Sequence, residues 1–235
     1  MKKEILAVIP ARGGSKGIPN KNIIDFCGRP LIEYTFEAAK KSKYLTRCVV
    51  STDDVKIANV AKQNEMEVII RPAELAQDNT TTAAVLRYLL ENLEKEGYQP
   101  DYTVILQPTS PLRTAEDIDK CLQMLLRDDK IDSVVSVQKV PHNCAPQKIM
   151  ELKEDRLVAV DDESHKFTTR QFVPEYYARN GAAVYAFKTK VFLETDSYYG
   201  DYCKPYLMSK VRSIDIDDKE DLLLAELVMK HERNL

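Results

Sequence analysis

Short apolar runs alternate with amphipathic stretches along most of this 235-residue chain. Residues 5–9 form a continuous apolar run bounded by Pro10 and a pair of glycines, which predicts a buried strand. Residues 31–43 carry apolar side chains at helical spacing and end in lysines, which favour the C-terminus of a helix. By the same criteria, further strands are expected at residues 47–51, 67–70, 103–106, 133–137, 181–187 and 211–216, and further helices at 55–64, 82–96, 115–127 and 219–233.

This alternation indicates the fold class. Strands separated by helical segments of roughly 10–15 residues need right-handed crossovers, and these place the strands side by side in a parallel sheet. We therefore expect an α/β fold with a doubly wound, mostly parallel sheet and helices on both faces. In open sheets of this kind, ligands lie beyond the carboxyl ends of the strands, so the loops that follow strands are expected to carry the chemistry.

The alternation breaks near residue 140. Residues 141–174 hold three prolines, scattered charges and only two short apolar pieces, at 149–152 and 157–160. A flexible linker is one interpretation, but the two pieces are typical of a hairpin that turns around 153–156. We expect residues 140–178 to form a small β-rich segment that folds against something else, such as a second subunit. Residues 1–139 and 179–235 are expected to form the α/β core.

Charge and cysteine content argue against several classes of protein. The chain has 34 Lys and Arg against 37 Asp and Glu, a net charge of −3, whereas proteins that coat nucleic acid or anionic membranes usually show a basic excess. The five cysteines include no C-x-x-C pair, which argues against a zinc ribbon or a disulfide scaffold. No segment approaches the roughly 18 apolar residues of a membrane helix. The N-terminus is typical of a strand and not of a signal peptide. We expect a cytoplasmic protein that binds neither nucleic acid nor membrane.

The loop after the first strand is the most unusual segment. Residues 11–22 contain three of the chain's seven glycines, together with Arg12, Lys16 and Lys21 and no acidic residue. Glycine lets the backbone aim N–H groups at a ligand, and donors combined with cations at a strand end favour polyphosphate binding. The segment is neither a P-loop nor a G-x-G-x-x-G motif. A solvated glycine turn is the alternative interpretation.

A second unusual segment is acidic. In the sequence Ser-Ile-Asp-Ile-Asp-Asp at 213–218, an extended backbone would put Asp215 and Asp217 on one face. Two such carboxylates repel unless a cation lies between them, and Mg²⁺ takes one or two carboxylates together with substrate phosphates. The alternative is structural, because Asp217 followed by Glu220 also fits a helix capping box.

Two further loops follow predicted strands. Residues 106–113 form a turn with two prolines that presents Gln107, Thr109, Ser110 and Arg113, although a good helix-entry loop would have the same spacing. Arg71 stands at the tip of the strand at 67–70, where a surface position is equally consistent with the sequence.

Taken together and in this order, these motifs resemble the CMP-sialic acid synthetases and, more broadly, the acylneuraminate cytidylyltransferase family, which includes enzymes for legionaminic and pseudaminic acids. The resemblance runs almost end to end. Enzymes that activate 3-deoxy-manno-octulosonate are related but carry a different first loop. The motifs are I-P-A-R-G-G-S-K-G-I-P-N-K-N at 9–22, S-T-D-D at 51–54, R-P-A-E-L-A at 71–76, L-Q-P-T-S-P-L-R at 106–113 and S-I-D-I-D at 213–217.

The resemblance implies a Rossmann-like nucleotidyltransferase fold and specific roles for residues. Asp215 and Asp217 are expected to hold Mg²⁺ and, with Arg12 and Lys21, to carry catalysis. The residues expected to bind CTP are Arg12, Gly13, Gly14, Ser15, Lys16, Lys21 and Asn22 at the phosphates or nearby, and Arg71 and Thr82 at the cytosine. The residues expected at the sugar are Gln107, Lys148, Arg170, Tyr185, Tyr198 and Tyr199.

The family also implies a homodimer, in which residues 140–178 mediate dimerisation and direct Lys148 and Arg170 toward the sugar carboxylate in the partner's site. The pair Tyr198–Tyr199 stands where characterised members have an aromatic pair near the acyl pocket, and its hydroxyls make that wall more polar. Sialic, legionaminic and pseudaminic acids therefore all stay open as substrates.

The reaction implied is attack of the sugar's anomeric hydroxyl on the α-phosphorus of CTP, which releases pyrophosphate and gives a CMP-sugar for cell-surface glycan biosynthesis. Positioning and charge neutralisation supply most of the catalysis in such reactions. Two alternatives remain. One is a nucleotidyltransferase for an octulosonate or a sugar 1-phosphate, and the other is a non-catalytic nucleotide-sugar sensor that has kept the pocket.

Overall fold

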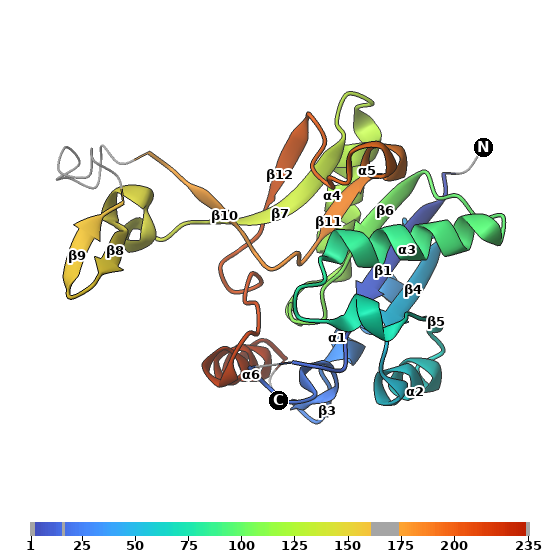
Figure 1. The fold of residues 1–235 in the computed structure, drawn as a ribbon, viewed down its shortest axis with the longest axis horizontal. Coiled ribbons are helices and arrows are strands. Elements are labelled where there is room, and N and C mark those ends of the chain that lie inside the picture. The colour runs from blue at the N-terminus through green and yellow to red at the C-terminus, as the bar shows by residue number, and fades with distance from the viewer. Residues whose placement is uncertain (1–2, 16, 161–173, 234–235) are drawn as a thin grey trace.

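An eight-stranded mixed sheet forms the centre of the molecule (Figure 1). The structure is a computed structural model that describes residues 3–15, 17–160 and 174–233. The strands follow the order β10-β7-β11-β6-β1-β4-β5, with β12 paired to β7 off this path. The strands are β1 (Ile5–Pro10), β4 (Arg47–Thr52), β5 (Glu67–Ile70), β6 (Tyr102–Ile105), β7 (Ser133–Lys139), β10 (Tyr177–Arg179), β11 (Tyr185–Lys188) and β12 (Cys203–Leu207).

Strand direction divides the sheet into two parts. Strands β6, β1, β4 and β5 are parallel, with Val8 opposite Val49 on one side and opposite Ile105 on the other. Strand β11 is antiparallel to both β6 and β7, β10 is antiparallel to the far end of β7, and β12 is parallel to β7. The expected α/β fold with a mostly parallel sheet is therefore confirmed, and the strand expected at 181–187 is one of the two that run in reverse.

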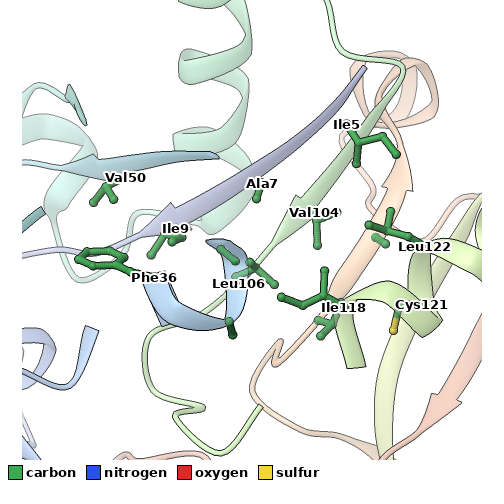
Figure 2. Close-up of a cluster of buried hydrophobic side chains, with 14 of the residues drawn as sticks. Ile5, Ala7, Ile9, Phe36, Val50, Val104, Leu106, Ile118, Cys121 and Leu122 are labelled. Atoms are coloured by element: carbon green, nitrogen blue, oxygen red, sulfur yellow. The ribbon is translucent and has the colours of Figure 1, made fainter. Parts of the chain in front are cut away.

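Helices cover both faces of the sheet, as the sequence predicts. Alternate residues of β1 point to opposite sides, because side chains in a strand have a period of two. Ile5, Ala7 and Ile9 pack with Phe36 and Ile118 on one face, and Figure 2 shows this cluster in close-up. The helices on this face are α1 (Ile32–Lys41), α2 (Val55–Gln63) and α4 (Ala115–Arg127). On the other face, Leu6 and Val8 pack against α3 (Thr82–Lys95) and α5 (Thr189–Thr195).

A third, smaller core lies beside the sheet. It joins the loop after β1, through Ile18, to the hairpin of β2 (Asp25–Phe26) and β3 (Arg29–Pro30) and to α6 (Lys219–Arg233). Ile216 is fully buried in this core. The basic loop and the acidic segment, which are far apart in the sequence, are thus packed into one unit.

The strand expected at 211–216 is wrong. A turn closes there instead, because the backbone N–H of Ser213 donates to the carbonyls of Ser209 and Lys210, while Ile216 N–H donates to the Thr109 carbonyl. The alternating pattern of this segment arises because Ile216 is buried under α6 while Asp215 and Asp217 line a cavity. The last strand of the sheet along the chain is instead β12, which also pairs with β7 and whose proline and lysine are typical of an edge strand.

The hairpin expected around 153–156 is present. Its strands are β8 (Met150–Lys153) and β9 (Arg156–Ala159), and they pair antiparallel with Leu152 opposite Leu157. Figure 1 shows it apart from the main sheet, beyond the ends of β7 and β10. Two short 3₁₀ turns precede it, η3 (His142–Cys144) and η4 (Pro146–Lys148). The division into a core and a segment at 140–178 stays a prediction, although residues 177–179 already belong to the main sheet as β10.

None of the described helices is long and apolar enough to cross a membrane.

Candidate active site

A cavity of about 370 Å³ opens at the carboxyl ends of β1, β5 and β6, where the topology predicts a ligand site. Five segments distant in the sequence contribute to its wall. Its polar lining side chains are Arg12, Ser15, Lys21, Asn22, Arg71, Gln77, Asp78, Thr80, Thr82, Gln107, Thr109, Asp215 and Asp217.

The basic loop supplies one side of this cavity. Lys21 begins the short turn η1 (Lys21–Ile23), and its ammonium donates to the Ile216 carbonyl at 2.8 Å and to Asp217 Oδ1 at 3.2 Å. Arg12 forms an ion pair with Asp78 at 2.9 Å. Asn22 is buried and donates from Nδ2 to the Arg12 carbonyl at 2.9 Å, which fixes the loop over the cavity.

Of the remaining residues predicted in this loop that the structure describes, two line the cavity and one does not. Gly14 and Ser15 line the cavity with Arg12. Gly13 lies behind the lining, where its N–H donates to Asp53 Oδ1 at 3.3 Å. A β-carbon added to Gly13 would lie 2.5 Å from Asp54 Oδ2, so only glycine allows this close approach. The predicted Lys16 lies outside the described residues.

Asp215 and Asp217 supply the acidic side. Asp215 lies against Gly181, which has a positive φ of 66°, and a β-carbon on Gly181 would lie 2.0 Å from Asp215 Oδ2. Burial raises the pKa of Asp215, a hydrogen bond from Thr109 opposes the rise, and the nearby charge of Asp217 adds to it. The Oδ1 atom of Asp215 is buried and has no hydrogen-bond partner among the described residues.

The structure rules out the capping interpretation of Asp217. The start of α6 is capped by Asp218, whose Oδ1 accepts from the N–H groups of Glu220 and Asp221 at 2.8 and 2.9 Å. Asp221 in turn accepts from the N–H groups of Asp217 and Asp218. The capping box formed by Asp217 and Glu220 is therefore wrong. The Asp217 side chain is 79% exposed and faces Lys21.

This pair fits a metal that is shared with a substrate. In the part of the chain that the structure describes, no group of three or more His, Cys, Asp and Glu residues gathers as a self-sufficient metal site. A buried carboxylate oxygen without a partner, beside a second carboxylate, leaves room for Mg²⁺ to take its other ligands from phosphates and water. Asp215 and Asp217 are the residues that would hold it.

Arg71 is buried, which resolves the choice left open by its position after a strand. Its side chain is 4% exposed, and its backbone N–H donates to the Thr52 carbonyl at 2.9 Å. Burial lowers the pKa of its guanidinium, and the charge of Asp53, 3.6 Å away, partly restores it. The Nε atom of Arg71 has no hydrogen-bond partner among the described residues. Thr82, at the start of α3, lines the same cavity.

Gln107 and Gly181 also border a second, more open groove of about 660 Å³. Three tyrosines predicted at the sugar form its wall: Tyr185 and Tyr198 have ring centroids 5.9 Å apart, and Tyr198 and Tyr199 meet edge to face at 5.1 Å. Burial raises the pKa of Tyr185. Arg179, which the sequence analysis missed, donates from Nη1 to the Tyr199 hydroxyl at 2.6 Å and lines this groove.

Lys148, one of the residues predicted at the sugar, lies elsewhere in the described chain. Lys148 is exposed at the end of η4, beside the hairpin, and lines neither the cavity nor the groove of its own chain. Arg170 lies outside the described residues.

The loop at 106–113 presents fewer side chains than expected. Arg113 is buried beneath the site, where it donates to the carbonyls of Gln107 and Ala183 and to the Thr35 hydroxyl at 2.6–3.0 Å. Burial lowers the pKa of Arg113 to about 10. Ser110 is also buried, whereas Gln107 and Thr109 reach the cavity. Arg113 therefore supports the loop from below and does not face a ligand.

Comparison with known proteins identifies the family of the chain. A family model described as "Cytidylyltransferase" matches residues 6–227. The chain belongs to the cytidylyltransferase family. Several of its curated relatives have names that specify cytidylyltransferases or CMP-sugar synthases.

Three curated relatives of this cytidylyltransferase have the same 34% identity. The N-acylneuraminate cytidylyltransferase of Escherichia coli aligns over 96% of the chain, but the chain spans only 52% of that relative's length. Post-translational flagellin modification protein B of Campylobacter coli aligns over 99% of the chain and 97% of its own length. The CMP-N,N'-diacetyllegionaminic acid synthase of Legionella pneumophila aligns over 96% of each.

Among solved structures, a CMP:2-keto-3-deoxy-manno-octonic acid synthetase complexed with CTP has a TM-score of 0.73 and covers 98% of the chain and all of its own. Its sequence identity is 18%, so this likeness concerns the fold alone. A 4-diphosphocytidyl-2C-methyl-D-erythritol synthase from Anaerococcus prevotii has a TM-score of 0.66 at 17% identity.

Proposed function

We propose that this cytidylyltransferase activates a nonulosonic acid of the sialic, legionaminic or pseudaminic type with CTP, giving the CMP-sugar and pyrophosphate in the cytoplasm. The observation that carries the proposal is the union of a basic cavity, two aspartates and a tyrosine-lined groove around shared residues, Gln107 and Gly181. The names of two of the three relatives also support it, because they specify nonulosonic acids.

The chain's own residues account for binding of the nucleotide. CTP carries about four negative charges near neutral pH, and cations together with backbone donors are the groups that grip a polyphosphate. Arg12, Lys21 and the backbone at Gly14 and Ser15 supply them from one side. Arg71 and Thr82 line the same cavity and would meet the cytosine. The nucleotide would therefore lie with its α-phosphate between these two groups of residues, near the aspartates.

The sugar would lie in the groove and present its anomeric hydroxyl past Gln107. The oxygen of that hydroxyl forms a bond to the α-phosphorus, the bond between the α-phosphorus and the bridging oxygen breaks, and pyrophosphate leaves with the electron pair. The hydroxyl proton passes to a base or to solvent. Holding the two reactants in line supplies much of the rate enhancement in this chemistry.

Mg²⁺ held by Asp215 and Asp217 would act as a Lewis acid that stabilises the charge developing on the phosphate oxygens. Lys21 holds Asp217 from the side of the basic loop, and Asp215 packs against the backbone of Gly181 just before β11. The Oδ1 atom of Asp215 keeps no hydrogen-bond partner among the described residues.

We also propose that two copies of the chain form a homodimer through residues 140–178. The hairpin exposes apolar side chains on both strands, and an isolated two-stranded hairpin is marginally stable in water at best. A second subunit would cover these side chains and bring Lys148 and Arg170 of one chain toward the sugar of the other. The exposed apolar residues are Ile149, Met150, Leu152, Leu157, Val158 and Val160.

The decisive test mixes the protein with CTP, Mg²⁺ and a panel of sialic, legionaminic and pseudaminic acids and measures pyrophosphate. Release with at least one member is expected, together with a dimeric mass in light scattering. Release only with 3-deoxy-manno-octulosonate or a sugar 1-phosphate would overturn the sugar class. Binding of CTP without turnover on any acceptor would leave a sensor and contradict the enzyme.

A further inference from the structure

The loop that follows β4 lies between two of the loops that line the cavity of the candidate active site. Strand β4 pairs with β1 on one side and with β5 on the other. At the end of β4, the Ser51 carbonyl accepts from the N–H of Ala11, and the Thr52 carbonyl accepts from the N–H of Arg71, both at 2.9 Å. The S-T-D-D motif at 51–54 is therefore hydrogen-bonded on one side to the basic loop, which is proposed to bind the phosphates, and on the other side to Arg71, which is proposed to bind the base.

One side-chain atom in this motif contacts both neighbours. Asp53 Oδ1 accepts from the backbone N–H of Gly13 at 3.3 Å and lies 3.6 Å from Nη2 of Arg71. Asp53 does not line the cavity, and its side chain is 22% exposed. It therefore acts on a ligand only through Gly13 and Arg71.

Arg71 depends on this carboxylate. Burial disfavours its charged form and lowers its pKa, and the positive charge of Arg12 acts in the same direction. Asp53 provides the largest opposing contribution to the pKa of Arg71. With one side of the guanidinium held by Asp53 and the Nε atom still without a partner in the described part of the chain, Arg71 keeps donors available for a ligand.

We propose that Asp53 is a positioning residue that fixes Arg71 relative to the Gly13 backbone and thereby sets the distance between the base site and the phosphate site. The proposal rests on CTP as the nucleotide. A guanidinium can only donate, so it matches the acceptor N3 of cytosine and opposes the N3–H of uracil. If Arg71 moves, discrimination between CTP and UTP is lost before the affinity for triphosphate is.

The test compares wild type with Asp53→Asn, which keeps the side-chain size and an acceptor oxygen for Gly13 but removes the charge beside Arg71. The dissociation constants of CTP and UTP are measured by calorimetry, and KM and kcat with CTP by pyrophosphate release. We expect the preference for CTP over UTP to fall about tenfold, through weaker CTP binding, while kcat at saturating CTP stays within about threefold.

Asp54→Asn is the matched control, because it also removes one carboxylate charge, at the next position in the chain. Asp54 caps α2 through the N–H groups of Lys56 and Ile57, and asparagine caps helices as well as aspartate does. Its preference for CTP over UTP should stay at the wild-type value. A double-mutant cycle completes the design: in an Arg71→Ala background, Asp53→Asn should change the preference no further.

An unchanged preference in a folded Asp53→Asn protein would overturn the proposal, and so would an equal loss with Arg71 already removed. If Asp53→Asn does not fold, Asp53→Glu, which keeps the charge but displaces it by one methylene, carries the same measurement. Failure of the proposed function is distinguishable, because wild type would then release no pyrophosphate with any nonulosonic acid, whereas the dissociation constants of CTP and UTP would still report on Asp53.

Discussion

The nucleotide cavity and the tyrosine groove meet at Gln107 and Gly181 but are built differently. In the cavity, each described basic side chain of the lining has an acidic partner from a different loop: Lys21 with Asp217, Arg12 with Asp78 and Arg71 with Asp53. In the groove, Tyr185, Tyr198 and Tyr199 contact one another, and Arg179 lies at the exposed rim.

This difference indicates how the two ends of the site respond to change. The cavity is held by ion pairs and backbone bonds that connect several strand loops, so one substitution disturbs several partners and the chemistry with them. The groove is a wall of neighbouring side chains, where a substitution alters the shape and polarity met by the sugar and little else. We therefore expect substitutions in the cavity to impair the nucleotide chemistry itself, and substitutions in the groove mainly to change which sugar is accepted.

The largest effect should come from Asp217→Ala. Loss of this carboxylate removes a proposed Mg²⁺ ligand and the partner of Lys21, so we expect kcat/KM to fall about 1,000-fold, equivalent to about 4 kcal/mol in the barrier. Pyrophosphate release over a Mg²⁺ titration is the measurement. Normal Mg²⁺-dependent turnover in this variant would rule out the metal role.

Asp218→Ala is the matched control for this prediction. It removes the cap of α6 next door, so it should cost about 1 kcal/mol of unfolding free energy but keep turnover.

Gly181→Ala tests the point where cavity and groove join. The added methyl group meets Asp215 and the backbone has positive φ, so Asp215 must move. We expect about a 100-fold loss of kcat/KM and about 2 kcal/mol of unfolding free energy. Gly97→Ala also has positive φ but meets no atom within 4 Å, so it should lose some stability and no activity. Equal activity in the two variants would contradict the contact with Asp215.

A smaller and more selective effect is expected in the groove. Tyr199→Phe removes the hydroxyl that holds Arg179, and this should raise KM for the sugar about threefold to tenfold, as expected for one hydrogen bond to a charged group. The KM for CTP should stay unchanged and serves as the internal control. A parallel rise of both constants would show that groove and cavity are not separable.

The smallest expected effect concerns stability. Burial raises the pKa of Asp215 in the folded protein, so folding favours its protonated form and its ionisation destabilises the fold above that pKa. Without ligands, Asp215→Asn should therefore raise Tm by about 2–4 °C near neutral pH, equivalent to about 1 kcal/mol. The gain should shrink as pH falls through the pKa of Asp215. The exposed Asp25→Asn should show no such gain in the same melting series.

Much of the fold could be predicted from the sequence because buried strands and amphipathic helices have local signatures. The β1 strand and the helices from α1 to α4 begin and end within two residues of the expected positions. The error at 211–216 has a physical cause: the alternation there places aspartates at the cavity and Ile216 under α6, and none of the strands in the described residues pairs with this segment. Strand β12 was missed because Lys204 and Pro205 weaken its apolar pattern.

The candidate site divides in the same way. The basic loop and the paired aspartates are visible in the sequence because concentrated like charges need a ligand, and the structure brings Arg12, Lys21, Asp215 and Asp217 to one cavity. The S-T-D-D motif drew attention to residues 51–54, but the contacts of Asp53 and Arg179 were missed because they lie 40 and 20 positions away, with Gly13 and Tyr199. No local pattern reports such a contact.

The bond between Lys21 and Asp217 has a further consequence for folding. The two residues are 196 positions apart, and closing such a long loop costs chain entropy that only the assembled sheet and α6 can offset. The part of the cavity between Lys21 and Asp217 should therefore form last during refolding, after most helical signal has returned. The rate at which nucleotide binding recovers, measured by stopped flow, would then report the rate of the final step of folding.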